Sequence, residues 1–165
     1  MYLAFEVLTV VIVACAMALA FAHALELPGK LRLDELGYRT VQTIYYPGFT
    51  LGGAAEPAAM LATFLLLLTK PLGSTPFWLM LFGLAALTFM QLIFWLMTQP
   101  VNRHWLRETQ ITDSAKRFFG TEDAEADALR HLGWAGLRDR WELSHVLRAI
   151  AGMVGLVFVT TAIAL

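Results

Sequence analysis

Charged residues are scarce in this 165-residue sequence. Asp, Glu, Lys and Arg together make up 15% of it, against about 25% in a typical soluble domain. Hydrophobic residues make up 58%, and most of them lie in long runs without charge. This composition excludes an ordinary soluble domain and predicts an integral membrane protein. The formal net charge is −1, which argues against nucleic acid as a partner.

Cysteine is almost absent. The single Cys15 lies inside the first apolar run, so no internal disulfide is possible. No Lys or Arg precedes that run, whereas a cleaved signal peptide needs a basic start, so we expect the run to be retained as a helix. The sequence shows no internal repeat and no low-complexity tract. We therefore expect one domain over residues 1–165.

Four apolar runs are long enough to cross a bilayer, which takes roughly 20 helical residues. They cover about 2–23, 48–68, 76–99 and 143–165. The sequence thus predicts an all-α fold, a four-helix bundle in the membrane with the lipid bilayer as its surroundings. Pro28-Gly29 is expected to form a turn after the first span, and Pro100 to end the third.

The second span carries an acid beside a proline, Glu56-Pro57. Pro57 has no N–H, so the carbonyl one turn earlier must find another donor inside the bundle. A carboxyl at that depth costs roughly 2.5–3.5 kcal/mol and normally faces the interior. We expect Glu56 to face the other helices.

The connections are expected to carry short interfacial helices. Asp34 can cap one whose apolar positions share a stripe, namely Leu36, Val41, Ile44 and Tyr45. In the long third connection, Thr121 and the acids after it predict a second helix start, and Gly133 its end.

Basic residues are distributed unevenly between the two sides. Eleven of the twelve Lys and Arg residues lie in the first and third connections or at their edges, and Lys70 alone lies on the other side. The positive-inside rule then places the long connections in the cytoplasm and both termini outside. The expected location is a bacterial inner membrane.

With this topology, polar residues from several spans meet at the cytoplasmic end. Residues 138–148 read R-D-R-W-E-L-S-H-V-L-R, and a helix there puts Trp141, His145 and Arg148 on one stripe. We expect a polar pocket built from His23, Glu26, Asn102, Trp141, Glu142 and His145.

Several segments resemble a known family. Residues 22–31 read A-H-A-L-E-L-P-G-K-L, and Pro100-Val101-Asn102 and Arg140-Trp141-Glu142 with His145 follow in order. Together they resemble the anthrone oxygenase-like family, a large group of small four-helix membrane proteins of mostly unknown function. The resemblance implies oxidation of anthrones to anthraquinones by dioxygen, the activity associated with characterised fungal members.

A cofactor is one open alternative. His23-x-x-Glu26 and Glu142-x-x-His145 are mirror-image pairs on two helices, similar to those of di-iron bundles. Such a set, His23, Glu26, Glu142 and His145, suits iron, manganese or zinc. A b-type haem with His23 and His145 as axial ligands is a weaker alternative.

A pocket without any cofactor is the second alternative. Four aromatic residues, Tyr45, Tyr46, Trp105 and Trp141, are expected to surround a flat lipophilic substrate. His145 or His23 would act as the base, with Glu142 one turn from His145, and Arg148 or Asn102 would hold an oxyanion. Removing a proton from a phenolic carbon acid gives a carbanion that reacts directly with dioxygen.

The third alternative has no catalysis. Trp and Tyr at the ends of membrane helices form an ordinary aromatic belt, and Arg148 can extend to the interface. Glu142 and His145 would then only lock the last helix in place. The protein would be an accessory or assembly subunit of a larger membrane complex, with residues 101–137 as its contact surface. Our leading prediction is a membrane oxidoreductase.

Overall fold

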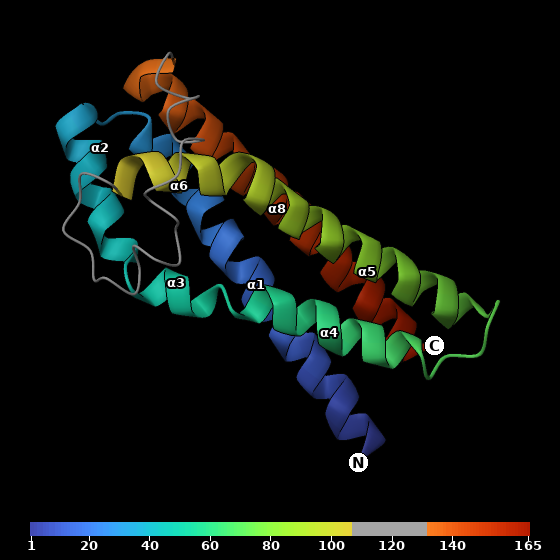
Figure 1. Ribbon diagram of the computed structural model, residues 1–165. Helices are drawn as coiled ribbons and strands as arrows, with labels where there is room; N and C mark the ends of the chain where they lie inside the picture. Colours follow the sequence, from blue (N-terminus) through green and yellow to red (C-terminus); the bar gives the residue numbers. More distant parts are fainter. Residues whose placement is uncertain (107–131) are drawn as a thin grey trace.

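The computed structural model describes residues 1–106 and 132–165, and every regular element in these ranges is a helix (Figure 1). Four helical segments are long and apolar enough to cross a membrane, as the sequence predicts: Tyr2–Lys30, Gly48–Leu67, Thr75–Arg103 and Gly133–Ala164. Both termini lie at the end of the molecule away from α2 and α6 (Figure 1).

The spans consist of the following elements. The first is α1 (Tyr2–Lys30), and the second is α3 (Gly48–Gly52) followed by α4 (Ala55–Leu67). The third is α5 (Thr75–Ile93), a π-helical turn (Phe94–Thr98) and α6 (Gln99–Leu106); the fourth is α8 (Gly133–Ala164). The short helix α2 (Glu35–Gln42) and a 3₁₀ turn (Thr43–Tyr45) connect the first two spans.

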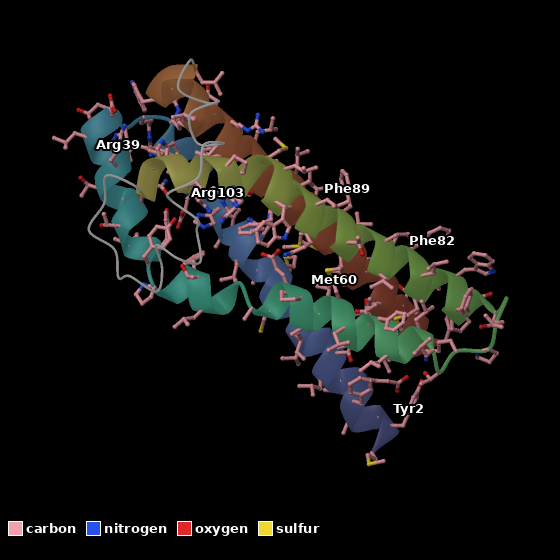
Figure 2. All side chains as sticks on the ribbon, in the orientation of Figure 1. Tyr2, Arg39, Met60, Phe82, Phe89 and Arg103 are labelled. Atoms are coloured by element: carbon pink, nitrogen blue, oxygen red, sulfur yellow. The ribbon has the colours of Figure 1, made fainter. Side chains whose placement is uncertain are left out.

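Small residues allow α8 to pack closely on its neighbours. A Cβ on Gly83 of α5 would lie 2.8 Å from Val159 Cγ2, and one on Gly152 would lie 3.1 Å from Met17 Cβ of α1. The hydrophobic effect does not drive helices together in lipid, so van der Waals packing between closely spaced backbones stabilises their association instead. The outer faces are apolar: Phe82 and Phe89 of α5 are 51% and 57% exposed (Figure 2).

The first span is longer than predicted. The turn expected at Pro28-Gly29 is wrong, because α1 continues through Pro28 to Lys30. Pro28 removes one helical hydrogen bond, and the helix ends with Leu31 N donating to Leu27 O at 3.0 Å. A proline is tolerated in this way in membrane helices. As a result, His23, Glu26 and Lys30 share one helix face.

The third span also continues past its predicted end. Pro100 lies inside α6 rather than ending the helix. Pro100 cannot donate to the carbonyl of Leu96, and the wide π turn opens the helix at this point. The guanidinium of Arg140 donates to that carbonyl instead, with 2.8 Å between NH2 and the oxygen.

The second span is interrupted between α3 and α4, as Pro57 suggests. The carbonyl of Gly53, which Pro57 cannot serve, accepts from the N–H of Glu56 at 3.1 Å. Glu56 is 7% exposed and faces the interior, as predicted.

The helix predicted after Asp34 is present as α2, and Asp34 Oδ1 accepts from Gly37 N at 2.8 Å. Its predicted apolar stripe is partly right: Val41 and Tyr45 pack into the core, whereas Leu36 and Ile44 are 76% and 70% exposed. The helix predicted from Thr121, and most of the predicted contact surface 101–137, lie outside the described residues. Gly133 is the first residue of α8, so the last helix begins well before the predicted start near residue 143.

Candidate active site

A cavity of about 310 Å³ lies where all four spans meet near the α2 end. Small-molecule sites usually have about 300–1,000 Å³. Its walls are largely aromatic, with polar groups between the rings. The lining includes Tyr45, Tyr46, Phe49, Phe94, Trp95 and Trp141, together with His23, Glu56, Gln91, Thr98, Asn102, His145 and Arg148.

Most of the predicted site residues come together at this cavity, although they lie on different helices. His23 comes from α1, Asn102 from α6, and Trp141, His145 and Arg148 from α8. Tyr45 and Tyr46, predicted to contact a substrate, line it from the α2–α3 connection. Three predicted residues, Glu26, Trp105 and Glu142, lie behind the walls instead.

Glu56 and Arg148 form a buried ion pair across the cavity wall. Arg148 NH2 is bonded to Glu56 Oε1, joining α8 to α4. With the Gln91 amide turned so that its nitrogen faces the carboxylate, Gln91 donates to Glu56 Oε2 at 2.7 Å and accepts from Trp95 Nε1 at 3.1 Å. Glu56 is thus held from both sides. Sequence analysis predicted that Glu56 faces inward but did not identify its partner.

The contact with Arg148 defines the tautomer of His145. Arg148 NH1 lies 3.2 Å from His145 Nδ1. A guanidinium has no acceptor atom, so Nδ1 accepts, and a neutral imidazole then carries its proton on Nε2. Nε2 is buried and has no hydrogen-bond partner within residues 1–106 and 132–165. His145, which lines the cavity, therefore has an unpaired N–H donor at Nε2, whereas the predicted role of general base needs a free lone pair.

Lys30, which the sequence reading missed, organises the wall behind His23. Its Nζ lies 3.2 Å from His23 Nδ1, 2.9 Å from Glu26 Oε2 and 3.5 Å from Glu142 Oε1. An ammonium only donates, so His23 Nδ1 also accepts and its proton lies on Nε2. The spacing of His23, Glu26 and Lys30 places all three on one face of a continuous helix. The turn expected at Pro28 would have separated Lys30 from that face, so Lys30 was not predicted as part of the site.

Two tyrosines bind the carboxylates that surround Lys30, and together with Lys30, Glu26 and Glu142 they form what we call the Lys30 cluster. Tyr45 donates to Glu26 Oε2 at 2.5 Å, and Tyr38 donates to Glu142 Oε1 at 2.7 Å. Burial, and then the bonded carboxylate, raises the pKa of Tyr45 well above its usual value; burial and the charge of Glu142 do the same to the pKa of Tyr38. Both hydroxyls therefore remain donors to the carboxylates.

These contacts bear on the predicted metal site. His23, Glu26, Glu142 and His145 do converge, but the Lys30 ammonium occupies donor atoms of the first three, and Arg148 faces Nδ1 of His145. Across the described ranges, no group of three or more His, Cys, Asp and Glu side chains is arranged to hold a metal ion. The donor set does not fit an iron, manganese or zinc site, because a cation of the protein already fills it.

The predicted haem ligands do not fit a haem either. The rings of His23 and His145 are in direct contact, with 4.2 Å between centroids and 47° between planes. Axial ligands lie on opposite faces of a macrocycle, and rings in contact leave no room for one between them. Both Nδ1 atoms also face cations, as described above.

Asn102 and Trp105 have different surroundings from those predicted. Asn102 Oδ1 accepts from Trp141 Nε1 at 2.8 Å, which ties α6 to α8 and leaves the amide nitrogen as the donor. Trp105 packs 5.9 Å from the ring of Trp141 and 5.5 Å from that of Tyr38. It belongs to a hydrophobic cluster behind the cavity and is not one of the lining residues, whereas the sequence predicted that it would contact the substrate.

Comparisons with protein-family models, curated proteins and solved structures found no match. The resemblance to the anthrone oxygenase-like family stays a prediction. What the cavity can do is therefore argued from its own groups: it is apolar, it has donors directed by two cations, and it has one carboxyl group, Glu56, among its described lining residues.

Proposed function

We propose that this protein is a membrane oxidoreductase that oxidises a lipophilic aromatic compound with dioxygen inside the cavity. The observation that carries the proposal is the unpaired Nε2 of His145 at an aromatic-walled cavity, beside the buried Glu56–Arg148 pair. The concentration of Lys and Arg in the first and third connections supports a cavity on the cytoplasmic side of a bacterial inner membrane, with both termini outside. The family resemblance of the sequence points to the same chemistry.

Substrate binding follows from the donors. A neutral imidazole N–H can polarise a carbonyl or phenolic oxygen, because it donates a hydrogen bond to the oxygen on which charge develops. His145 Nε2 would bind such an oxygen, with the charge of Arg148 behind the ring stabilising an enolate. Tyr45, Phe49 and Trp141 would hold the flat ring system by stacking and edge contacts.

Proton removal is assigned to Glu56. Each of its oxygens accepts one hydrogen bond and retains a further lone pair. The predicted bases, His23 and His145, carry their protons on Nε2 and have their lone pairs turned toward cations. Glu56 would take a proton from an activated CH₂ group, and the resulting carbanion is delocalised into the oxygen held by His145.

The oxidation then balances without a cofactor. The carbanion gives one electron to dioxygen, and the radical pair combines to form a C–O bond; the peroxide anion takes the proton back from Glu56. Loss of the second C–H proton breaks the O–O bond, expels hydroxide and forms the carbonyl. Hydroxide takes up that proton, so one CH₂ group and one dioxygen give one ketone and one water.

The test uses the full chain in lipid nanodiscs with 1,8-dihydroxyanthrone as the probe. An oxygen electrode should record one dioxygen consumed per anthrone, while absorbance reports the quinone and a peroxide assay shows no release. His145→Ala should retain the fold by circular dichroism and should lose the rate, which controls for spontaneous oxidation of the probe. A rate equal in wild type and in His145→Ala would refute the proposal.

A further inference from the structure

We propose that ligands enter the cavity from the bilayer, through an opening between the α3–α4 junction and the π-helical turn of the third span. The inference concerns access to the cavity and rests on the proposed function only for the choice of probe.

The position of the opening follows from exposure. Of the described lining residues, three are exposed: Ala54, Pro57 and Trp95. Ala54 and Pro57 stand at the start of α4, and Trp95, 48% exposed, stands on the π turn. A residue that both lines a cavity and is exposed marks its mouth. The mouth thus lies between the second and third spans.

The surroundings of the mouth are suited to lipid. Leucines within one turn of its edges along the chain are exposed: Leu51, Leu61, Leu92 and Leu96 are 73%, 59%, 49% and 66% exposed. Both edges belong to segments apolar enough to cross a membrane. A rim of exposed leucine is unfavourable in water and neutral in hydrocarbon. The mouth is therefore open to the bilayer and not to the aqueous phase.

The opposite end of the cavity is closed by side chains. Tyr45 and Trp141 line the cavity at this end, and Tyr38, Val101, Trp105 and Leu137 pack behind them in one hydrophobic cluster. Lys30, 3% exposed, and Glu142, 2% exposed, add buried charges to this barrier. A lipophilic molecule would have to cross both layers to arrive from the aqueous side.

Two interruptions of the helices account for the opening. α4 packs against α5, whereas α3, beyond the break at Gly53, packs against α1 and the 3₁₀ turn (Figure 1). On the other side the π turn widens the third span just before Pro100. Residues of both defects line the cavity, Gly53 and Ala54 on one side and Phe94, Trp95 and Thr98 on the other, so both interruptions border the opening.

The first experiment measures binding of 1,8-dihydroxyanthraquinone to the full chain in nanodiscs, by stopped-flow quenching of tryptophan fluorescence. Ala54→Phe should slow association by about tenfold, since a larger side chain at the mouth narrows the route into the cavity. Ala58→Phe is the matched control: Ala58 is an exposed alanine of α4 outside the lining, and its variant should bind at the wild-type rate.

The second experiment locates the mouth without a ligand. A nitroxide on Ala54→Cys, in a Cys15→Ser background, should collide more often with dioxygen than with a water-soluble nickel chelate. Unchanged association in Ala54→Phe, or greater contact of the label with the nickel chelate, would overturn the inference. If the anthraquinone binds at these rates but the anthrone is not turned over, the proposed oxidation is refuted and the proposed route of entry is not.

Discussion

Arg148→Met should destabilise the folded protein by about 3–5 kcal/mol, because it leaves a buried carboxylate without its cation. Glu56 and Arg148 are 7% and 4% exposed, so water cannot replace the lost charge. The remaining contact of Glu56 is the neutral amide of Gln91. Methionine keeps much of the volume of the arginine stem, so lost packing contributes little to the expected effect.

The double variant Glu56→Gln/Arg148→Met tests the cause of that loss. Removing both charges leaves no uncompensated ion, so the double variant should be more stable than Arg148→Met alone. The coupling energy from the cycle should be about 2 kcal/mol or more. Reversible unfolding in mixed micelles titrated with dodecyl sulfate, followed by tryptophan fluorescence, measures all four proteins.

An exposed pair gives the matched control. Arg39 and Glu35 are 2.9 Å apart on α2, with side chains 37% and 45% exposed. The cycle of Glu35→Gln and Arg39→Met should give a coupling of about 0.2–1 kcal/mol. If the Glu56–Arg148 coupling were no larger than this, the assignment of a desolvated pair at the cavity wall would be refuted.

Three further predictions concern protonation and the Lys30 cluster. Nitrogen-15 NMR at neutral pH should find the His145 proton on Nε2, and Arg148→Met should remove that preference; a proton on Nδ1 in the wild type would contradict the tautomer. Burial raises the pKa of Tyr38, Tyr45 and Tyr46 above the usual value of about 10. An absorbance titration, with Tyr→Phe variants to assign each signal, should find these three tyrosines protonated at pH 10. Their ionisation at that pH would contradict the prediction. Tyr38→Phe should cost about 1.5–3 kcal/mol in dodecyl sulfate unfolding, because Glu142 loses a buried donor; a loss within error would count against that bond.

The number of spans and the cap at Asp34 could be predicted because both are local signals. The ends of the helices could not be predicted from the sequence. Pro28 and Pro100 were expected to end helices, but each removes only one hydrogen bond, and at Pro100 the orphaned carbonyl of Leu96 is served by Arg140. That donor lies 44 residues away in sequence, so no local pattern reveals it.

The site was predictable to the extent that topology brings helix ends together. His23, Asn102, Trp141, His145 and Arg148 meet for that reason. Pairing was not predictable: Glu56 and Arg148 are 92 positions apart. The stripe predicted after Asp34 was right for Val41 and Tyr45 and wrong for the other two residues. Near lipid, apolar side chains are stable on either face of a helix, so Leu36 and Ile44 carry no information about the packed face.

The two cations explain what kind of ligand the cavity selects. Lys30 faces Nδ1 of His23, and Arg148 faces Nδ1 of His145, so two touching imidazoles both present N–H groups as donors. Three acceptor oxygens nearby are already engaged: Glu26 Oε2 by Tyr45, Glu142 Oε1 by Tyr38, and Asn102 Oδ1 by Trp141. A ligand that brings only donors would leave these N–H groups unpaired in an apolar cavity, at a cost of about 1–3 kcal/mol each. The cavity should therefore prefer a carbonyl or phenolate oxygen on an aromatic ring over the corresponding amine or hydrocarbon, and anthraquinone should bind more tightly than anthracene in the same quenching assay. Equal affinity for the two would mean that the imidazoles do not contact the ligand.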